Sequence, residues 1–194
     1  TIASVSASSG SSIDVTVNSI SGSGTIRLDL NGSGTGIIDA ASNEAAGYSS
    51  GELYTIDQTL PAVTGIVRNT PASAATNADS VLYTVTFSEN VSGVDISDFT
   101  LTRTGTANGI IASVSTSSGT SFDVTVNSIT GDGTIRLDLN DSGTGIVDND
   151  SNPADGYTSG QVYTIDNTAP SVTSIVRTTP SAATTNATTV IYTV

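Results

Sequence analysis

The chain repeats itself with few changes at a fixed distance. Residues 1–85 align without a gap on residues 110–194, so that Asp57 corresponds to Asp166 at an offset of 109 residues. About two thirds of the aligned positions carry the same residue. A repeat of this length is too long for one turn of a solenoid, and it matches a β-sandwich domain of about 100 residues. The chain is therefore predicted to be a tandem array of one domain type.

A short junction motif marks where one repeat ends and the next begins. Each copy ends a strand-like run on an aspartate, turns, and restarts after a proline. The motif reads Tyr54-Thr-Ile-Asp57-Gln-Thr-Leu-Pro61 and then Tyr163-Thr-Ile-Asp166-Asn-Thr-Ala-Pro170. It divides the chain into the C-terminal part of one repeat (1–57), a complete repeat (58–166) and the N-terminal part of the next (167–194).

The complete repeat contains seven segments in which apolar and polar residues alternate, as they do in half-buried β-strands. These segments cover 63–68, 81–87, 99–101, 110–115, 122–126, 135–139 and 161–165. Turn-forming residues at 118–120 and 130–133 are expected to make hairpin-like connections. No segment shows helical periodicity or a capping box. Seven antiparallel strands in this length predict an all-β fold of tandem immunoglobulin-like seven-stranded sandwiches.

The composition removes several classes of function. The net charge is −13, with 18 acidic residues, so the surface would repel a nucleic-acid backbone. Cysteine and histidine are absent, which excludes thiol and imidazole chemistry and the metal sites built on those side chains. No apolar run approaches the ~18 residues of a membrane helix, so no membrane insertion by this segment is expected.

Several runs in the complete repeat resemble a known family. They read Val85-Thr-Phe-Ser-Glu89-Asn-Val91, Ser97-Asp98-Phe99-Thr-Leu101, and Arg136-Leu-Asp138-Leu-Asn140 followed by Ile146-Val-Asp148. In this order, and with the junction motif, they resemble the tandem bacterial Ig-like repeats of giant secreted adhesins and biofilm surface proteins. The resemblance covers the whole chain. It implies an extended extracellular stalk at the cell surface, whose partners are neighbouring repeats or identical subunits, often with calcium at the joints.

Carboxylates gather at the pole where such a sandwich would meet the repeat before it. The first strand enters beside Asp57, at the pole that also carries the segments 89–98 and 141–160. Carboxylates at close range repel one another unless they are protonated or bridged by a cation, and calcium takes about 6 to 8 such oxygens. The candidate calcium ligands are Asp57, Glu89, Asp95, Asp98, Asp148, Asp150, Asn152 and Asp155, with Asp166 at the following joint.

The run Asp148-Asn-Asp150-Ser-Asn152 has the alternate-residue spacing that opens an EF-hand loop. The rest of the EF-hand pattern is absent, because Pro153 stands where a glycine is needed and no helices flank the loop. In the first copy Asp39 and Asn43 keep their places, whereas Ala41 replaces the middle carboxylate. Asp39 and Asn43 are therefore candidates for a weaker site or one with other ligands.

Each of these groups also has an interpretation without metal. Asp57 and Asp166 can cap a turn, and the acidic residues of the long loop can form a solvated surface. Four aspartates lie within predicted strands, beside Arg27 or Arg136, and are expected to make surface cross-strand pairs worth less than about 1 kcal/mol: Asp14, Asp29, Asp123 and Asp138.

Three classes of function are compared. A structural spacer of an extracellular adhesin or surface filament, stiffened by calcium, fits the repeat best. A glycan- or surface-binding module is the alternative, and an exposed tyrosine in the segment 141–160 would favour it. An enzyme is not expected, because no constellation of nucleophile and base is present. Any surface or glycan ligand would then lie elsewhere in the parent protein.

The two ends suggest a window cut from a longer array. A fibre assembled by strand exchange is the rival hypothesis. Residues 167–194 correspond to the first strands of a repeat and residues 1–57 to its last strands, so molecules joined head to tail would complete most of a domain.

Overall fold

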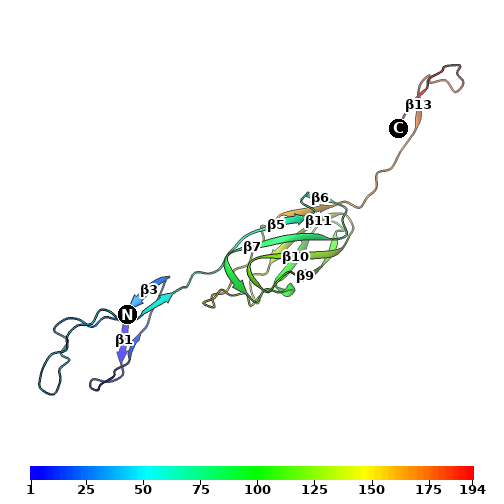
Figure 1. Ribbon diagram of the computed structural model, residues 1–194. Coiled ribbons are helices and arrows are strands. Elements are labelled where there is room, and N and C mark those ends of the chain that lie inside the picture. The colour runs from blue at the N-terminus through cyan, green and yellow to red at the C-terminus, as the bar shows by residue number, and fades with distance from the viewer.

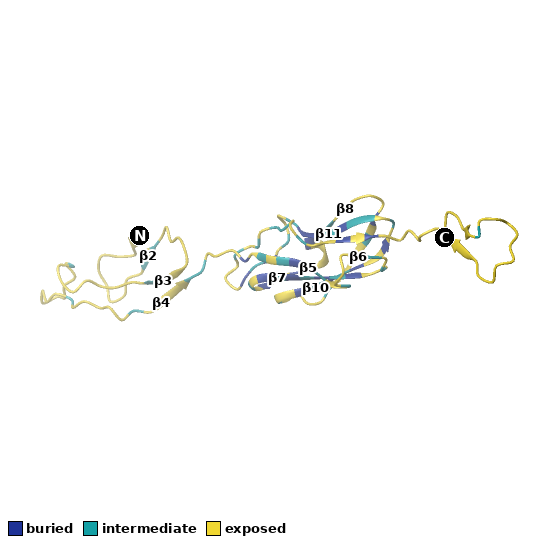
Figure 2. Ribbon diagram, turned by 90° about the horizontal axis from the view of Figure 1, so that it is seen from above, coloured by how far each residue is buried: buried dark blue, intermediate teal, exposed yellow.

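The computed structural model describes residues 1–194 as β-strands joined by turns and loops, with one short 3-10 helix. The core is central in the chain, because all 19 residues of the buried apolar cluster fall between Ile66 and Ile165. The segments on either side project from opposite ends of this central body (Figure 1). They are exposed along nearly their whole length (Figure 2). The predicted all-β class is confirmed, and no helix has the length and apolar character to cross a membrane.

Two four-stranded sheets make up the central body. The first contains, in spatial order, β5 (Val63–Thr70), β7 (Val81–Ser92), β10 (Ser118–Thr130) and β9 (Asn108–Val114). The second contains β6 (Ala75–Thr76), β12 (Val162–Ile165), β11 (Gly133–Leu139) and β8 (Phe99–Arg103). All neighbours are antiparallel except β6 and β12, which are parallel. The part of the chain that directly follows the junction therefore contributes β5 to the first sheet and β6 to the second.

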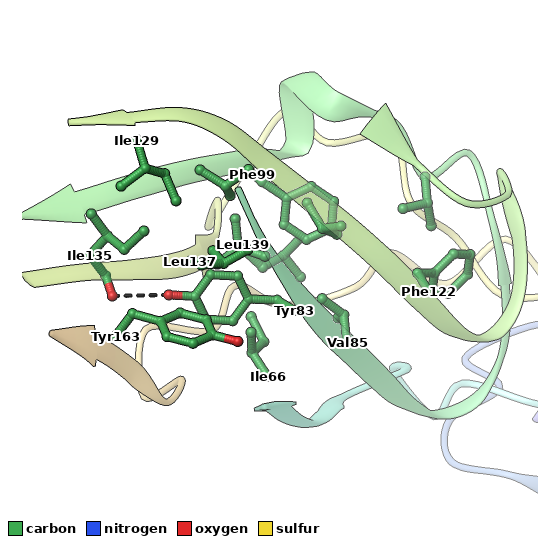
Figure 3. Packing of buried hydrophobic residues seen from close by; sticks show 14 of the residues in the cluster. Ile66, Tyr83, Val85, Phe99, Phe122, Ile129, Ile135, Leu137, Leu139 and Tyr163 are labelled. Carbon is green, nitrogen blue, oxygen red and sulfur yellow. Dashed lines mark hydrogen bonds between the residues drawn. The ribbon is translucent and has the colours of Figure 1, made fainter. Parts of the chain in front are cut away.

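The inner faces of the two sheets pack against each other, as in a β-sandwich. Alternation along β7 buries Val81, Tyr83, Val85 and Phe87 while the residues between them stay partly exposed. The ring of Tyr83 meets that of Tyr163 edge-on from the opposite sheet at 5.1 Å between centroids. The Tyr83 hydroxyl donates to the main-chain oxygen of Ile135 at 2.9 Å (Figure 3), so this buried polar group is satisfied across the core.

All seven predicted strand segments coincide with strands, although β7 and β10 extend further than the alternation suggested. Two local predictions are wrong. β10 begins at Ser118, so residues 118–120 are not a turn; Gly119, with φ of 136°, lets the strand continue through a shift in register. A capping box is present where none was predicted, since the 3-10 helix η1 (Ile96–Asp98) is capped by Asp95.

The cross-strand pairing predicted for Asp29 and Asp138 is also wrong, whereas Asp123 on β10 does pair across strands, accepting from the Thr84 hydroxyl of β7 at 2.7 Å. Asp138 pairs with Arg136 of its own strand at 2.6 Å, and Asp29 pairs at 2.7 Å with Arg27, which is the last residue of a strand and lies two residues before it. Residues two apart on a strand share one face, which explains this geometry. Asp138 is buried rather than at the surface, and it also accepts a hydrogen bond from the Thr102 hydroxyl at 2.5 Å.

The end segments form isolated two-stranded ribbons. Before the junction these are β1 (Ile2–Val5) with β2 (Val15–Val17), and β3 (Gly24–Arg27) with β4 (Leu53–Ile56). After the central body, β13 (Val176–Thr179) pairs with β14 (Ile191–Thr193). None of these ribbons contains a buried residue, so each presents apolar side chains to solvent.

Candidate metal centre

Three acidic side chains meet where the chain enters the central body. Asp57 lies in the linker after β4, Glu89 on β7, and Asp148 in the loop between β11 and β12. One carboxylate oxygen from each lies within 4.8 Å of those of the other two. Asp148 is buried at 5% exposure, whereas the other two are partly exposed. Separate segments thus bring three negative charges to one point of the junction.

The linker is held against β7 next to Glu89. The amide of Ala62 donates to the Ser88 hydroxyl at 3.0 Å, and the amide of Ser88 donates to the Ala62 carbonyl at 2.8 Å. Pro61 is buried at this contact. Because Ser88 directly precedes Glu89, these bonds fix the distance between the linker and that carboxylate.

Asp148 is positioned by a loop that closes on its own carboxylate. One oxygen, Oδ1, accepts from the amides of Asp150 and Asn152 at 2.9 and 2.8 Å, and Oδ2 accepts from Asn152 Nδ2 at 2.8 Å. The same amide group donates to the main-chain oxygen of Asp57 at 3.2 Å. Asn152 therefore connects the loop to the linker, and the alternate-residue spacing has a local hydrogen-bonding explanation.

The first copy of the sequence builds the same loop. Asp39 Oδ1 accepts from the amides of Ala41 and Asn43 at 2.8 and 2.9 Å, and Asp39 Oδ2 accepts from Asn43 Nδ2 at 2.9 Å. Ala41 donates through its backbone, so the loop does not need the carboxylate that this copy lacks. Asp39 and Asn43 are exposed in the end segment, and no carboxylate cluster forms around them.

The electrostatics of the three carboxylates differ. Desolvation, followed by the negative charges of Asp148, Asp57 and Asp150, raises the pKa of Glu89. Desolvation also raises the pKa of Asp148, but the hydrogen bonds from Asn152 and Asp150 outweigh it and leave that pKa below its ordinary value. The molecule's two ion pairs lie elsewhere, so no arginine neutralises this group. Of the three carboxylates, Glu89 is therefore the one whose negative charge is most disfavoured by its neighbours.

Asp57 also caps the turn that follows it. Its Oδ1 accepts from the amide of Thr59 at 2.9 Å and from the Ser23 hydroxyl at 3.1 Å. The hydrogen bonds from Thr59 are the main reason that the pKa of Asp57 is lowered. The capping role and a place in the cluster are therefore compatible for this residue.

Two of the candidate ligands serve the 3-10 helix instead. Asp95 Oδ1 accepts from the amide and hydroxyl of Ser97 at 2.7 and 2.6 Å, and Asp98 Oδ2 accepts from the Asp95 amide at 2.7 Å. Neither belongs to the carboxylate cluster. The second oxygen of Asp98 is buried without a hydrogen-bond partner.

The remaining candidates lie outside the cluster. Asp150 acts on Glu89 only through its charge, and Asp155 is exposed in the same loop. Asp166 is exposed and accepts from the amide of Thr168 at 3.0 Å, which is the turn-capping role. Residues aligned with Glu89 and Asp148 at this second junction would lie beyond residue 194.

Sequence reasoning missed a residue that holds the second junction. Asp132 accepts from the Asn167 amide at 2.6 Å and from the Thr168 hydroxyl at 2.8 Å. Its counterpart Ser23 accepts from the Gln58 amide at 3.0 Å in the first junction. Asp132 lies in the turn before β11, at the end of that strand where the junction also lies. That position was the signal in the sequence that could have pointed to its role.

Tyr157, the tyrosine of the loop that follows β11, packs against the core cluster and pairs with Leu139 through backbone hydrogen bonds. It is half-buried, so the exposed tyrosine that would favour glycan binding is not found at this position.

No family model, no curated protein and no solved structure matches the chain.

Proposed function

We propose that the chain is a series of immunoglobulin-like repeats that act as a structural spacer in an extracellular adhesin or surface filament. The sequence repeat supports this, because one domain type that recurs in tandem along a chain is typical of an extended spacer. The strand order also supports it: in this proposal β5, β7, β10 and β9 would correspond to strands A, B, E and D, and β12, β11 and β8 to G, F and C. The extended arrangement in Figure 1 suits a spacer.

Calcium bound by Asp57, Glu89 and Asp148 would stiffen the joint in this proposal. The observation that carries it is the convergence of the three carboxylates within 4.8 Å. Calcium–oxygen distances are about 2.3–2.6 Å, so ligands on opposite sides of one ion lie about 5 Å apart, and the spacing suits a single ion. The ion would neutralise the repulsion on Glu89 and join the linker, a strand and a loop. Waters would complete its coordination.

The test is thermal unfolding of the chain in calcium and in excess chelator. At a calcium concentration about ten times the Kd, binding to the folded state alone adds about 1.4 kcal/mol, which raises Tm by several degrees. Glu89→Gln should weaken calcium binding by roughly tenfold or more, because it removes a charged ligand. In chelator this variant should be at least as stable as the wild type, since it also removes the repulsion.

Asp155→Asn is the matched control, because it removes a carboxylate that belongs to the loop carrying Asp148 but lies outside the cluster. It should respond to calcium as the wild type does. Small-angle scattering on the same samples should show a longer, stiffer particle in calcium. Calcium would be removed from the proposal if it left the Tm of the wild type unchanged. The same would follow if calcium changed the Tm of the Glu89→Gln and Asp155→Asn variants equally.

A further inference from the structure

Asparagine is followed by glycine at two places in the chain, Asn31-Gly32 and Asn108-Gly109. In this dipeptide the backbone nitrogen of the glycine can reach the side-chain amide carbon of the asparagine, because no Cβ obstructs its approach. Both asparagines are exposed, so water reaches them. Asn108 lies in the central body, at the start of β9, which is an edge strand of the first sheet (Figure 1). The contacts around it therefore decide how reactive its side chain is.

The side chain of Asn108 is folded back over the amide that would attack it. The backbone N–H of Gly109 donates to Asn108 Oδ1 at 2.9 Å. Because Oδ1 is bonded directly to Cγ, the Gly109 nitrogen lies beside the carbon with which it would form a bond. Reactions are accelerated by holding the reacting atoms in contact, about 3–3.5 Å apart. The observed conformation is thus close to the one that ring closure needs.

A guanidinium group acts on the same carbonyl oxygen. Arg103, the last residue of β8, donates from Nη1 to Asn108 Oδ1. The turn between β8 and β9 brings these two residues together, and it is held in place by the Thr104 amide, which donates to the Thr134 carbonyl at 3.0 Å. Oδ1 of Asn108 therefore accepts from two donors, one of which carries a positive charge.

No carboxylate competes for the Arg103 guanidinium, because both ion pairs of the molecule are formed by other arginines. Negative charge develops on Oδ1 as a nitrogen adds to Cγ, and a charged donor aimed at that oxygen stabilises it. Asn31 lacks this arrangement. Arg27, the arginine closest to it in sequence, donates instead to Asp29 at 2.7 and 3.0 Å. The two Asn-Gly dipeptides thus differ in the one contact that favours the reaction.

We propose that Asn108 is a site of spontaneous modification, at which Arg103 promotes closure of Asn108 and Gly109 to a succinimide. The Gly109 nitrogen loses its proton to solvent and bonds to Cγ, while Nδ2 takes a proton from solvent and leaves as ammonia. Water then opens the ring at either carbonyl and leaves aspartate or isoaspartate at position 108. One water is consumed for each ammonia released, and no oxidant or reductant is needed. The site depends neither on the spacer role nor on calcium.

Conversion changes both the charge and the main chain. Either product adds a carboxylate to a chain whose net charge is already −13. Isoaspartate also lengthens the main chain where Asn108 pairs with Thr130. The adjacent Gly109 is closely packed, since a Cβ added to it would lie 3.0 Å from Val126 Cγ1 and 3.4 Å from Ile129 Cγ1. Isoaspartate therefore weakens the attachment of β9 to its sheet, whereas aspartate preserves it.

The test is peptide mapping by mass spectrometry of the full chain during incubation in mildly alkaline buffer. Asn31 is the internal reference, because it belongs to the same molecule and is followed by the same residue. In the folded protein Asn108 should convert roughly tenfold faster than Asn31. This is less than the hundredfold or more of a buried oxyanion donor, because the contact is exposed to water. In urea the two rates should become equal, and both products should form.

Two substitutions separate the Arg103 contact from a general effect of charge. Arg103→Met removes the donor and should slow the conversion of Asn108 roughly tenfold, to the rate of Asn31. Arg177→Met removes the same charge from a segment outside the central body and should leave the rate at Asn108 unchanged. Neither substitution should alter the rate at Asn31.

Each contrary result identifies a different fault. The proposal would be overturned if Asn108 converted no faster than Asn31 in the folded protein, or if Arg103→Met left its rate unchanged. Equal slowing by Arg103→Met and Arg177→Met would assign the effect to net charge and overturn the role of the contact. Aspartate without isoaspartate would indicate direct hydrolysis of the side-chain amide and overturn ring closure. If Arg103→Met does not fold, the comparison of folded and urea-unfolded wild type decides the question.

Discussion

Two aspartates three residues apart show how strongly position controls a carboxylate. Hydrogen bonds from the side chain and amide of Ser97 lower the pKa of Asp95. Desolvation raises the pKa of Asp98, and the hydrogen bond from the Asp95 amide only partly opposes it. Both residues form one capping box on η1, so residue type and local role do not by themselves set the sign of the shift.

These opposite shifts predict opposite pH dependences. The folded-state pKa of Asp98 is above its unfolded value, so its favourable contribution is complete below the unfolded pKa, about 3.9, and is lost as pH rises through the folded pKa. Wild-type protein should therefore lose stability relative to Asp98→Asn as pH rises from about 3 to 7. The variant keeps an oxygen for the Asp95 amide.

Urea unfolding at several pH values measures the difference, and Asp95→Asn is the control. The folded-state pKa of Asp95 is lowered, so its contribution is present above the unfolded pKa and is lost as pH falls through the folded pKa. The stability of the wild type relative to Asp95→Asn should then increase as pH rises. Differences that do not change with pH, or that share one sign, would contradict this interpretation of the capping box.

At the scale of elements, the connection between β10 and β11 is held by close backbone contact. Gly131 has φ of 75°, and a Cβ built on it would collide with the carbonyl of Thr106 in the neighbouring loop. Thr106 in turn donates to and accepts from Asp132 through its backbone and hydroxyl groups. A glycine is required here both by conformation and by space.

Gly131→Ala should lower the free energy of unfolding by about 3 kcal/mol, because backbone strain and a steric clash add. Gly143→Ala is the control: its φ is 76°, but nothing lies within 4 Å of the position that the added methyl group would take, so only strain of about 1 kcal/mol applies. Urea denaturation of both variants measures the difference. Equal losses would show that the close contact at Gly131 relaxes without cost.

At the scale of the whole molecule, two junctions lie at opposite ends of the central body, and they are fastened differently (Figure 1). In the first junction the Gln58 amide donates to the Ser23 hydroxyl, whereas in the second the aligned Asn167 amide donates to the Asp132 carboxylate. The hydrogen bonds from the Asn167 amide and the Thr168 hydroxyl lower the pKa of Asp132, as expected for a carboxylate held by donors.

Asp132→Ala should release the start of the following segment. The amide of Asn167 would lose its acceptor, and we expect its hydrogen exchange to accelerate by roughly tenfold. Asp132→Ser places the residue of the first junction at this position and should retain most of the protection, since the Ser23 hydroxyl accepts from the equivalent Gln58 amide. Unchanged exchange in Asp132→Ala would show that this contact does not hold the junction.

Seven of the eight strands of the central body could be predicted from the sequence alone, because alternation is a local property and follows directly from which face each residue presents. The exception is β6, which has only two residues and so shows no alternation. The repeat was equally visible, and Asp57, Glu89 and Asp148 were among many candidate ligands. Nothing in the sequence selects these three from the rest. Asp150 and Asn152 have ligand-like spacing, yet the loop uses that spacing to hold Asp148 through backbone amides.

Which carboxylates meet was settled by the tertiary structure. The meeting of the three carboxylates depends on how the linker docks on β7 and how the long loop folds back. Neither can be read from the alternation of neighbouring residues. The same holds for Asp132, whose acceptor role appears only when the turn and the junction lie together. Local patterns reflect the residues that each strand buries, whereas a site depends on segments distant in sequence and is fixed by packing.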